Sequence, residues 1–351
     1  MKSVGTITFH WANNYGAVLQ AFALQRHLLK TGFDTEIIHY LPFRAILATA
    51  ISAAKARDFA FFRKTRKFRD FRKKELRIGK KKYFSNKALF SCKDKYSAVI
   101  TGSDQIWNMS FTKKAEGRPT LSYYLNFAGE HTNRISYATS FGTGKMDAAV
   151  AKLIAPELKK YSAISVRETS AVQMLDALGI SAQCVLDPTL LLSAKDYEPL
   201  IEKHTGVTAD PVFSYILHSN QEAAETISKY VCTKYSSSSA NAGGRLSCSI
   251  YEWLYRIKNA KFVVTNSFHG TVFALLFHIP FITVAIPNSG MNDRITTLLG
   301  ALGLSDRIFY EFDGTAIDSA LSGEIDWNGV DSRLESLKEQ SKAFLAEALK
   351  W

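Results

Sequence analysis

The sequence predicts an α/β protein made of two doubly wound, Rossmann-like domains. Short runs that are apolar on both faces, such as Phe262–Thr265, are typical of strands in a parallel sheet that helices cover on both sides. These runs alternate along the chain with helical segments, which is the pattern of βαβ units. The length of 351 residues exceeds what one compact core usually organises, so we expect two domains of ordinary size.

The first domain is predicted at residues 1–193 and opens with a β-loop-α-β unit. Val4–Phe9 is the first strand, Ala17–Lys30 is a helix that Gly32 ends, and Glu36–Tyr40 is the second strand. The loop before the helix therefore lies at the carboxyl end of a strand. The later elements are strands at Tyr96–Thr101, Arg134–Thr139, Tyr161–Val166 and Gln183–Leu186 and a helix at Thr169–Leu178.

The second domain is predicted at residues 208–325, after a linker from Ser193 to Asp210. Tyr235–Arg245 is rich in serine and glycine and is expected to be a mobile loop. Residues 331–351 form a terminal helix, which we expect to pack back on the first domain. Two such domains with polar loops facing a central cleft form a GT-B-like layout. The other elements are strands at Phe213–Leu217, Phe262–Thr265 and Phe281–Ala285 and helices at Glu222–Lys234, Ile250–Ile257 and Arg294–Leu302.

The net charge of +12 comes from one segment. Residues 44–95 hold 18 Lys and Arg against 4 Asp and Glu, a net charge of +14, so the rest of the chain carries −2. Ala45–Lys82 is predicted to be helical, with phenylalanines interleaved among the cations. Such a basic helix can lie on an anionic membrane surface, although a solvated hairpin packed through its phenylalanines has the same pattern. Nucleic-acid binding is not expected, because no recognised motif accompanies the charge.

The composition excludes several other classes of protein. No run of eighteen uncharged apolar residues predicts a transmembrane span, and the amino terminus lacks a signal-peptide pattern. We therefore expect a cytoplasmic protein, associated peripherally with the inner face of the cytoplasmic membrane if the basic segment binds lipid. The cysteines are scattered, with neither metal-ligand spacing nor a disulfide framework: Cys92, Cys184, Cys232 and Cys248.

The polar turn after Phe262–Thr265 predicts an anion site beside His269. Gly270 lets a ligand approach the backbone, because it has no side chain. Thr271 is expected to cap the apolar helix that follows, whose first amides favour an anion. As a histidine, His269 can donate a proton to a leaving phosphate or accept one from a hydroxyl. A purely structural role for this histidine stays open.

Other reactive groups are predicted at the carboxyl ends of strands, where open α/β sheets bind ligands. Arg167 can hold a phosphate or carboxylate with two parallel hydrogen bonds, and Asp104 is the acidic candidate for activating a hydroxyl. The structural alternatives are pairing of Arg167 with Glu168 or a helix end, a capping role for Asp104 and a turn role for Asp187. The loops that carry these groups hold Asn13, Asn14, Tyr15 and Gly16, Asp104 and Gln105, Arg167 and Glu168, Ser267 and His269, and Asp293 and Arg294.

Five motifs, taken in order, make the chain resemble the polysaccharide pyruvyl transferase family. The resemblance runs from about residue 3 to about residue 305. The strings SDQIWN and SFHGT are specific as a set. The motifs are Asn13–Gln20 (NNYGAVLQ), Gly102–Asn108 (GSDQIWN), Ser165–Glu168 (SVRE), Val185–Thr189 (VLDPT) and Ser267–Thr271 (SFHGT).

The resemblance implies a GT-B-like fold and transfer of pyruvate from phosphoenolpyruvate to a sugar, as a cyclic ketal that bridges two hydroxyls. The expected acceptor belongs to a cell-surface polysaccharide precursor linked to polyprenyl diphosphate. In better-understood relatives, an arginine matching Arg167 and a histidine matching His269 bind the donor. A second arginine of those relatives corresponds to Ser267, so Arg294, Arg245 or backbone amides replace it, or the donor differs.

The predicted site combines three catalytic candidates with a set of substrate contacts. The catalytic candidates are His269, Asp104 and Glu168. Neither a metal nor a cofactor is expected, because no step of the reaction demands one and no ligand cluster is visible. The predicted substrate contacts are Arg167, Ser267, Gly270, Thr271, Arg294, Asn13, Asn14, Tyr15 and Gln105.

Two other functions remain compatible with the same fold. A glycosyltransferase of the GT-B type would use a nucleotide sugar, and would need a carboxylate for the ribose and a pocket for the base. Neither feature can be placed in the sequence. A non-catalytic relative that binds glycans is the other alternative, and the serine at position 267 is the observation that favours it.

Overall fold

The computed structural model describes residues 3–56, 59–206, 208–217, 222–237, 248–287 and 289–350. Arg245, Asn288 and most of the predicted loop Tyr235–Arg245 lie outside these ranges. The chain divides into two compact units, and the helices α3 and α14 contribute residues to both. The first unit holds Met1–Phe62, Arg69–Leu191 and Leu337–Trp351, and the second holds Arg63–Phe68 and Leu192–Ser336.

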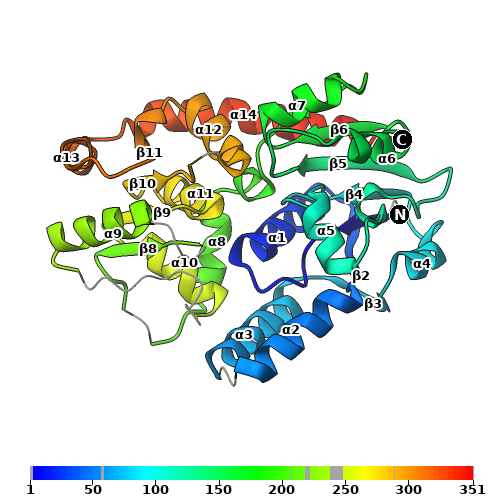
Figure 1. Cartoon of the computed structure of the whole chain (residues 1–351), viewed down its shortest axis with the longest axis horizontal. Helices are drawn as coiled ribbons and strands as arrows, with labels where there is room; N and C mark the ends of the chain where they lie inside the picture. The colour runs from blue at the N-terminus through cyan, green and yellow to red at the C-terminus, as the bar shows by residue number, and fades with distance from the viewer. Residues whose placement is uncertain are drawn as a thin grey trace. The chain divides into compact units, whose positions relative to one another are not determined.

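A seven-stranded sheet forms the centre of the first unit (Figure 1). All of its neighbouring strands pair in parallel, in the order β3-β2-β1-β4-β5-β6-β7. Parallel strands need crossover connections, and helices supply most of them. The strands are β1 (Ser3–Ile7), β2 (Asp34–Tyr40), β3 (Ile78–Tyr83), β4 (Ala98–Thr101), β5 (Asn133–Thr139), β6 (Ala163–Val166) and β7 (Gln183–Cys184).

Helices bury both faces of this sheet, so the side chains of β1, β4 and β6 are buried on both sides apart from the first residue of β1 and of β6. On one face, Leu24 of α1 and Leu345 of α14 pack with Val4 and Ile100. On the other face, Val99 packs in a cluster that includes residues of α6 and α7. The helices are α1 (Tyr15–Lys30), α2 (Phe43–Ala56), α3 (Phe59–Glu75), α4 (Asn86–Leu89), α5 (Met109–Glu116), α6 (Ala148–Leu158), α7 (Thr169–Asp176) and α14 (Trp327–Ala348).

The strand order of the first unit reverses between β1 and β4. From β1 the chain builds outward through β2 to β3, and then returns to place β4 on the other side of β1. In doubly wound sheets, the crevice at the carboxyl ends of the strands beside such a reversal is where ligands bind. The segments that follow β1 and β4 therefore mark the expected position of a site within this unit.

The second unit contains a smaller parallel sheet of four strands in the order β11-β10-β9-β8. The strand predicted at Phe262–Thr265 is observed as β9 with the same bounds. The other strands are β8 (Val212–Tyr215), β10 (Phe281–Val284) and β11 (Ile308–Phe309). The helices are α8 (Ala194–Ile201), α9 (Glu222–Lys234), α10 (Ile250–Lys258), α11 (Phe268–Leu276), α12 (Asp293–Ala301) and α13 (Gly314–Ser322).

These two sheets confirm the predicted α/β class with two doubly wound domains, but some local predictions are wrong. The supposed linker from Ser193 to Asp210 contains α8. Its start is fixed by a capping box, in which the backbone amide and hydroxyl of Ser193 donate to Asp196 at 2.9 and 3.0 Å. In the sequence, the charged residues of α8 and its internal Pro199 make the helix hard to recognise. In the structure, Tyr197 and Leu200 form its buried face.

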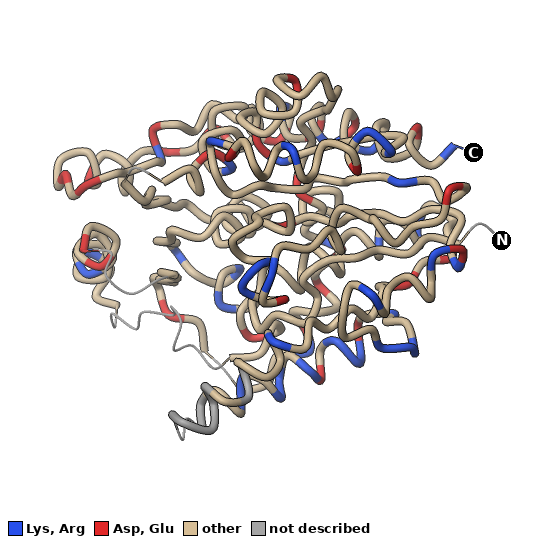
Figure 2. Tube along the Cα trace, turned by 45° about the vertical axis from the view of Figure 1, so that its right-hand side comes forward, with Lys and Arg blue, Asp and Glu red and all other residues tan. Residues whose placement is uncertain are grey.

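The basic segment is not one helical hairpin. Its end forms β3, an edge strand in which only Gly79 and Tyr83 are buried while three lysines face solvent. Lysines are a common protection of edge strands against unwanted pairing. Phe68 and Phe71 of α3 are buried, so these aromatic side chains belong to the core of the protein. Figure 2 shows the cations concentrated along the same region. None of the helices in the described ranges is long and apolar enough to cross a membrane.

We predict that Leu345→Ala lowers the free energy of unfolding by about 2–5 kcal/mol, the usual cost of removing a buried leucine side chain. Leu345 is 1% exposed and packs in the core beneath the first sheet. Gln340→Ala, an exposed position on the same helix, serves as the control and should change stability little. Urea denaturation measures both, and an unchanged midpoint for Leu345→Ala would contradict the packing of α14 on the sheet.

Candidate functional site

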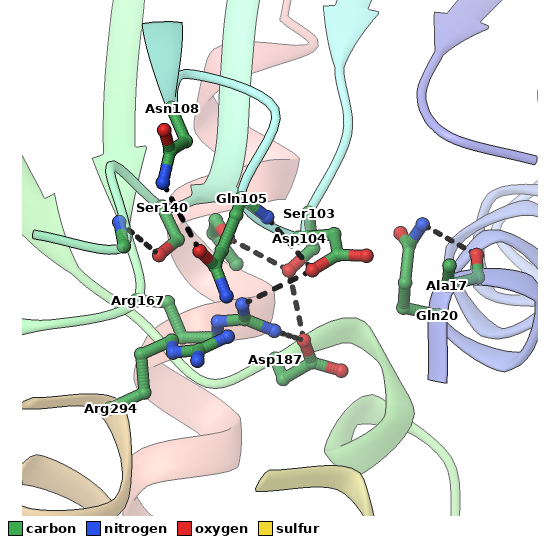
Figure 3. Close-up of polar contacts among 12 residues, drawn as sticks. Ala17, Gln20, Ser103, Asp104, Gln105, Asn108, Ser140, Arg167, Asp187 and Arg294 are labelled. Carbon is green, nitrogen blue, oxygen red and sulfur yellow. Dashed lines mark hydrogen bonds and ion pairs between the residues drawn. The ribbon is translucent and has the colours of Figure 1, made fainter. Parts of the chain in front are cut away.

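A buried cluster of charged and hydroxyl side chains lies at the carboxyl edge of the first sheet (Figure 3). We call it the Arg167 cluster, and it consists of Ser103, Asp104, Arg167, Asp187 and Thr189. Ser103 and Asp104 follow β4, Arg167 follows β6, and the other two residues follow β7. Strands that end at one edge of a sheet thus bring together residues that lie up to 86 positions apart in the sequence.

Asp187 is the acceptor at the centre of the Arg167 cluster. Its Oδ2 accepts a hydrogen bond from Arg167 Nη1 at 2.6 Å and lies 2.8 Å from the hydroxyl of Ser103. Its Oδ1 accepts from the backbone amide and the hydroxyl of Thr189, at 3.0 and 2.6 Å. The side chains of Arg167 and Asp187 are 1% and 0% exposed. The predicted turn role of Asp187 is therefore only part of its function, since it also fixes the arginine.

Asp104 is held next to Arg167 by a strained backbone. Its φ angle is +84°, which side chains rarely adopt, and its Oδ1 accepts from the amide of Gln105 at 2.8 Å. Arg167 Nη2 lies 3.8 Å from the same Oδ1. The side chain of Asp104 is 19% exposed, whereas that of Asp187 is fully buried. Asp104 is thus the carboxylate of this cluster that solvent can reach.

A second strained residue supports the same region. Ala138 of β5 has a φ angle of +51°, at an irregularity in the pairing of β5 with β6. Its carbonyl oxygen lies 2.8 Å from the hydroxyl of Ser103. Strained backbone persists where surrounding contacts over-determine it, and such positions gather at functional sites. Two of them lie here on either side of Ser103.

Glu168, predicted as a catalytic candidate, instead supports the loop after β5. Its Oε1 accepts from the hydroxyl of Ser140 and the amide of Phe141, at 2.8 and 3.0 Å. The residue is 1% exposed. A carboxylate with these partners and no access to solvent is poorly placed to remove a proton from a sugar hydroxyl, so Asp104 is the better candidate for a base.

The loop after β1 carries three of the predicted substrate contacts. Asn14 caps α1, since its Oδ1 accepts from the amide of Ala17 at 3.1 Å, and Tyr15 is fully buried in the core. Arg72 of α3 donates to Asn13 Oδ1 at 3.3 Å and to two backbone carbonyls of the loop. Burial, together with the charge of Arg69, lowers the pKa of Arg72 to about 10. Arg72, which belongs to the basic segment, therefore holds the loop after β1 in place through hydrogen bonds.

A polar connection beneath that loop was missed by sequence reasoning. Gln20 Nε2 donates to Thr8 Oγ1 at 2.8 Å, and the hydroxyl of Thr8 donates to the carbonyl of Ser103 at 3.1 Å. These bonds join α1 and β1 to the start of the Arg167 cluster. His10 lies next to these hydrogen bonds. Burial lowers its pKa to about 3, so it is neutral at physiological pH. The NNYGAVLQ motif contains Gln20, but spacing alone could not show its partner.

The remaining first-unit candidate, Gln105, is largely buried and packs beside a glycine turn. Its Oε1 lies 3.3 Å from Asn108 Nδ2. A Cβ atom on Gly142, whose φ angle is +62°, would lie 2.0 Å from the same Oε1. The close approach requires a glycine there. Gln105 also donates its backbone amide to Asp104, and Figure 3 shows its side chain beside Arg167.

In the second unit, the turn after β9 differs from the prediction in its cap. Ser267 is the N-cap residue of α11: its hydroxyl oxygen accepts from the amide of Gly270 at 3.3 Å. The amide of Thr271 donates to the carbonyl of Ser267. Thr271 therefore is not the cap, and the amides of Gly270 and Thr271, expected to bind an anion, are used within the helix. Ser267, the position that the resemblance aligns with a second arginine, is thus a helix cap.

Gly270 and Thr271 are packing residues. A Cβ atom on Gly270 would lie 2.5 Å from Thr265 Oγ1, so the glycine allows α11 to approach β9 rather than a ligand to approach the backbone. Thr265 Oγ1 cannot move easily, because it donates to the carbonyl of Tyr215 at 2.6 Å. The hydroxyl of Thr271 lies 2.7 Å from that of Thr283 on β10.

His269 and Arg294 remain as the reactive groups of this unit. His269 lies in the first turn of α11, is 6% exposed and meets the ring of Phe268 edge-on at 5.2 Å. The guanidinium carbon of Arg294 lies 5.8 Å from the centre of the same ring. Arg294 also donates to the carbonyl of Met291 through Nε and Nη2, at 3.3 and 3.2 Å. The ring of Phe268 thus contacts both reactive groups, the imidazole of His269 and the guanidinium of Arg294.

A groove of about 1020 Å³ lies at the opposite edge of the first sheet, at the starts of β5, β6 and β7. Asn133, Lys160, Gln183 and Phe344 are among its lining residues, and none of the predicted site residues is. Because the chemistry of doubly wound sheets lies at the carboxyl ends of strands, we assign the candidate site to the Arg167 cluster and not to this groove.

The described ranges contain no group of His, Cys, Asp or Glu placed to hold a metal ion. The four cysteines are free thiols.

Comparison with known families decides the assignment. The family model of polysaccharide pyruvyl transferase matches residues 14–288. The chain belongs to the polysaccharide pyruvyl transferase family. The match covers the Arg167 cluster and the turn that contains His269, whereas Asn13 and Arg294 lie outside it. A comparison with curated proteins gave no significant match.

Solved structures show the fold of this pyruvyl transferase family member. The UDP-N-acetylglucosamine 2-epimerase from Rickettsia bellii aligns with a TM-score of 0.57 and 11% identity, covering 99% of this chain and 96% of that one. The UDP-GlcNAc 2-epimerase from Methanocaldococcus jannaschii aligns with a TM-score of 0.55 and 13% identity, covering 99% of this chain and all of that one. These are enzymes of the GT-B fold, so the predicted GT-B-like class is confirmed.

We predict that Asp187→Asn destabilises the protein by about 3 kcal/mol, because it removes the negative charge that lies closest to the buried guanidinium of Arg167. The asparagine has nearly the same shape, so the effect reports on charge. Asp147→Asn provides a matched control, since Asp147 is an exposed helix cap and asparagine caps equally well. Thermal unfolding of both variants tests this, and equal stability of the two would show that the buried ion pair is unimportant.

We also predict that Gly270→Ala lowers stability by about 1–3 kcal/mol through the clash with Thr265. Gly300→Ala is the matched control in the last turn of α12, where a new Cβ would meet nothing closer than Ser305 Oγ at 3.8 Å. That substitution should leave stability unchanged or raise it by up to about 1 kcal/mol, because alanine favours helix. If both variants denature at the same urea concentration, α11 does not pack as closely on β9 as described.

Proposed function

We propose that this protein transfers pyruvate from phosphoenolpyruvate to a sugar of a cell-surface polysaccharide precursor, forms a cyclic ketal and releases phosphate. Membership of the polysaccharide pyruvyl transferase family supports this proposal. The single structural observation that carries it is the buried, oriented arginine at the carboxyl edge of the sheet. Arg167 is fixed through Nη1 by Asp187, as an anion-binding arginine must be if it is not to lose side-chain entropy on binding.

The proposed chemistry proceeds in three stages and needs no metal or cofactor. A proton adds to the methylene carbon of phosphoenolpyruvate, which becomes a methyl group and leaves the central carbon electrophilic. The oxygen of one sugar hydroxyl bonds to that carbon and loses its proton to a base. The carbon–oxygen bond to phosphate then breaks, and the second hydroxyl adds at the same carbon and releases its own proton. The product is a ketal of pyruvate, with inorganic phosphate as the leaving group.

The residues divide this work according to their chemistry. Arg167 holds the carboxylate or phosphate of the donor, because its guanidinium presents paired N–H groups to such anions. His269 is the acid that protonates the donor or the departing phosphate, since an imidazole can both carry a proton and give it up in a reaction. Asp104, the solvent-accessible carboxylate of the Arg167 cluster, removes the proton of a sugar hydroxyl. Arg294 supplies the second positive charge for binding the donor, because Ser267 stands at the position where the resemblance implies a second arginine.

We propose further that the acceptor is linked to polyprenyl diphosphate and that the protein works at the anionic inner face of the cytoplasmic membrane. A precursor with a long lipid chain stays in the bilayer, so its enzyme benefits from a means of contacting that surface. The segment 44–95, with its net charge of +14, supports this location through attraction to anionic headgroups.

We predict that Arg167→Lys and His269→Ala each lower the rate of phosphate release by about 10²-fold or more, from the usual scale of acid–base catalysis and of positioned charges. Lysine retains a positive charge beside Asp187, so loss of activity in this variant would report on donor geometry and not on folding. Asp147→Asn should retain full activity. The assay measures phosphate release from phosphoenolpyruvate with and without a lipid-linked sugar acceptor, and mass spectrometry identifies the pyruvate adduct less water.

The same protein separates the alternatives. A thermal shift with nucleotide sugars and none with phosphoenolpyruvate would favour a glycosyltransferase. Binding of glycans without turnover of any donor would favour a non-catalytic relative. Normal turnover in both Arg167→Lys and His269→Ala would remove these two residues from the reaction.

A further inference from the structure

The apolar side of helix α2 faces solvent. Phe43, Ile46, Leu47 and Ile51 are 61%, 38%, 44% and 44% exposed. Their spacing of three and four positions places them in one stripe along the helix. A surface helix of a globular protein normally packs such a stripe against the core. In α2 the stripe faces solvent instead. A contiguous exposed apolar surface of this kind marks a site of interaction.

Two neighbouring elements extend this stripe. The amide of Phe43 donates to the carbonyl of Phe84, which directly follows β3 and is itself 46% exposed. Helix α5 packs against α2 and contributes Phe111, which is 44% exposed. We call the combined surface of Phe43, Ile46, Leu47, Ile51, Phe84 and Phe111 the α2 face. All of its residues belong to the first unit.

The charges near the α2 face favour a negatively charged partner. Helix α2 contains no Asp or Glu, and Arg44 at its start is exposed beside Gly117, the residue that ends α5. Lys113 and Lys114 of α5 are exposed as well, as is Lys82 before Phe84. Glu116, the acidic residue of α5, points inward: Ser122 donates to its Oε2 at 3.2 Å and its Oε1 is buried.

The basic helix α3 does not have the same character. Its residues Phe68 and Phe71 are in the core, and Arg72 donates into the loop after β1. Lys67 forms an ion pair with Glu252 at 3.0 Å. Two of the aromatic side chains that made this helix a membrane candidate in the sequence are therefore used for packing. Phe62, at the start of α3, is 53% exposed, but the stripe of exposed apolar side chains lies on α2.

We infer that the α2 face docks on an anionic lipid bilayer, with its apolar stripe among the acyl chains at the headgroup boundary and its lysines and arginines on the phosphates. Large apolar side chains flanked by cations are the pattern of helices that lie in a membrane interface. Docking rests on the proposed function only in the choice of a membrane as the place of work, because lipid binding requires no turnover.

The test is co-sedimentation of the full chain with vesicles of phosphatidylcholine alone and of phosphatidylcholine with phosphatidylglycerol. We expect binding to the anionic vesicles that weakens as salt rises, because exposed charges are screened. The triple variant Phe43→Ser, Leu47→Ser, Ile51→Ser should bind about tenfold or more weakly, since interfacial affinity follows the apolar area that is buried. All three side chains are exposed, so the fold should persist, which circular dichroism verifies.

Leu153→Ser is the matched control. Leu153 is 41% exposed on α6, a helix that lies apart from α2 in Figure 1, and its substitution should leave vesicle binding unchanged. Equal binding of the wild-type protein and the triple variant would overturn the inference. So would a wild-type dimer that the triple variant dissociates without any binding to vesicles, because the α2 face would then join two copies of the chain. Phosphate release with a water-soluble acceptor should be the same in the triple variant, which separates this test from that of the catalytic proposal.

Discussion

The ion pair between Asp187 and Arg167 is the interaction on which the candidate site depends. Both side chains are removed from water, which costs several kcal/mol per charge unless hydrogen bonds compensate it. Asp187 lies within hydrogen-bond distance of a guanidinium, two hydroxyls and one backbone amide. A carboxylate supported in this way stays ionised inside the protein, and its charge keeps the arginine in one position. The ion pair, together with the hydrogen bond from Ser103, therefore connects the segments that follow β4, β6 and β7.

Strain at Asp104 and Ala138 is the counterpart of that rigidity. A left-handed backbone at a residue other than glycine costs about 1–3 kcal/mol, and two such residues flank Ser103. The pairing of β5 shifts register at Ala138, which turns its carbonyl toward Ser103. The result is that one carboxylate, Asp104, reaches solvent while the other, Asp187, does not. Two acidic groups close to the same arginine thus acquire different roles from their backbone settings alone.

Much of the fold was predictable because its strands are short apolar runs with polar ends. The sequence placed β9 with its observed bounds and predicted Arg167 and Asp104 at strand ends. It could not predict the partner of Arg167, because Asp187 lies 20 residues away and a turn before proline explained it equally well. The role of Ser267 as a helix cap was also missed. A serine hydroxyl can either cap a helix or contact a ligand. The role of Ser267 could be assigned only once the first residue of α11 was known.

The core of the first unit includes the last residues of the chain. Leu345 of α14 and Leu349, which follows the helix, pack against residues of strands that lie nearly two hundred or more positions earlier in the sequence. Ser341 of the same helix accepts a hydrogen bond from the amide of Leu186 and so completes the end of the sheet. During synthesis, the apolar surface of the first sheet is consequently covered only after α14 has been made. A polypeptide that stops at residue 191 would expose that surface, and this half of the protein is not a separable module.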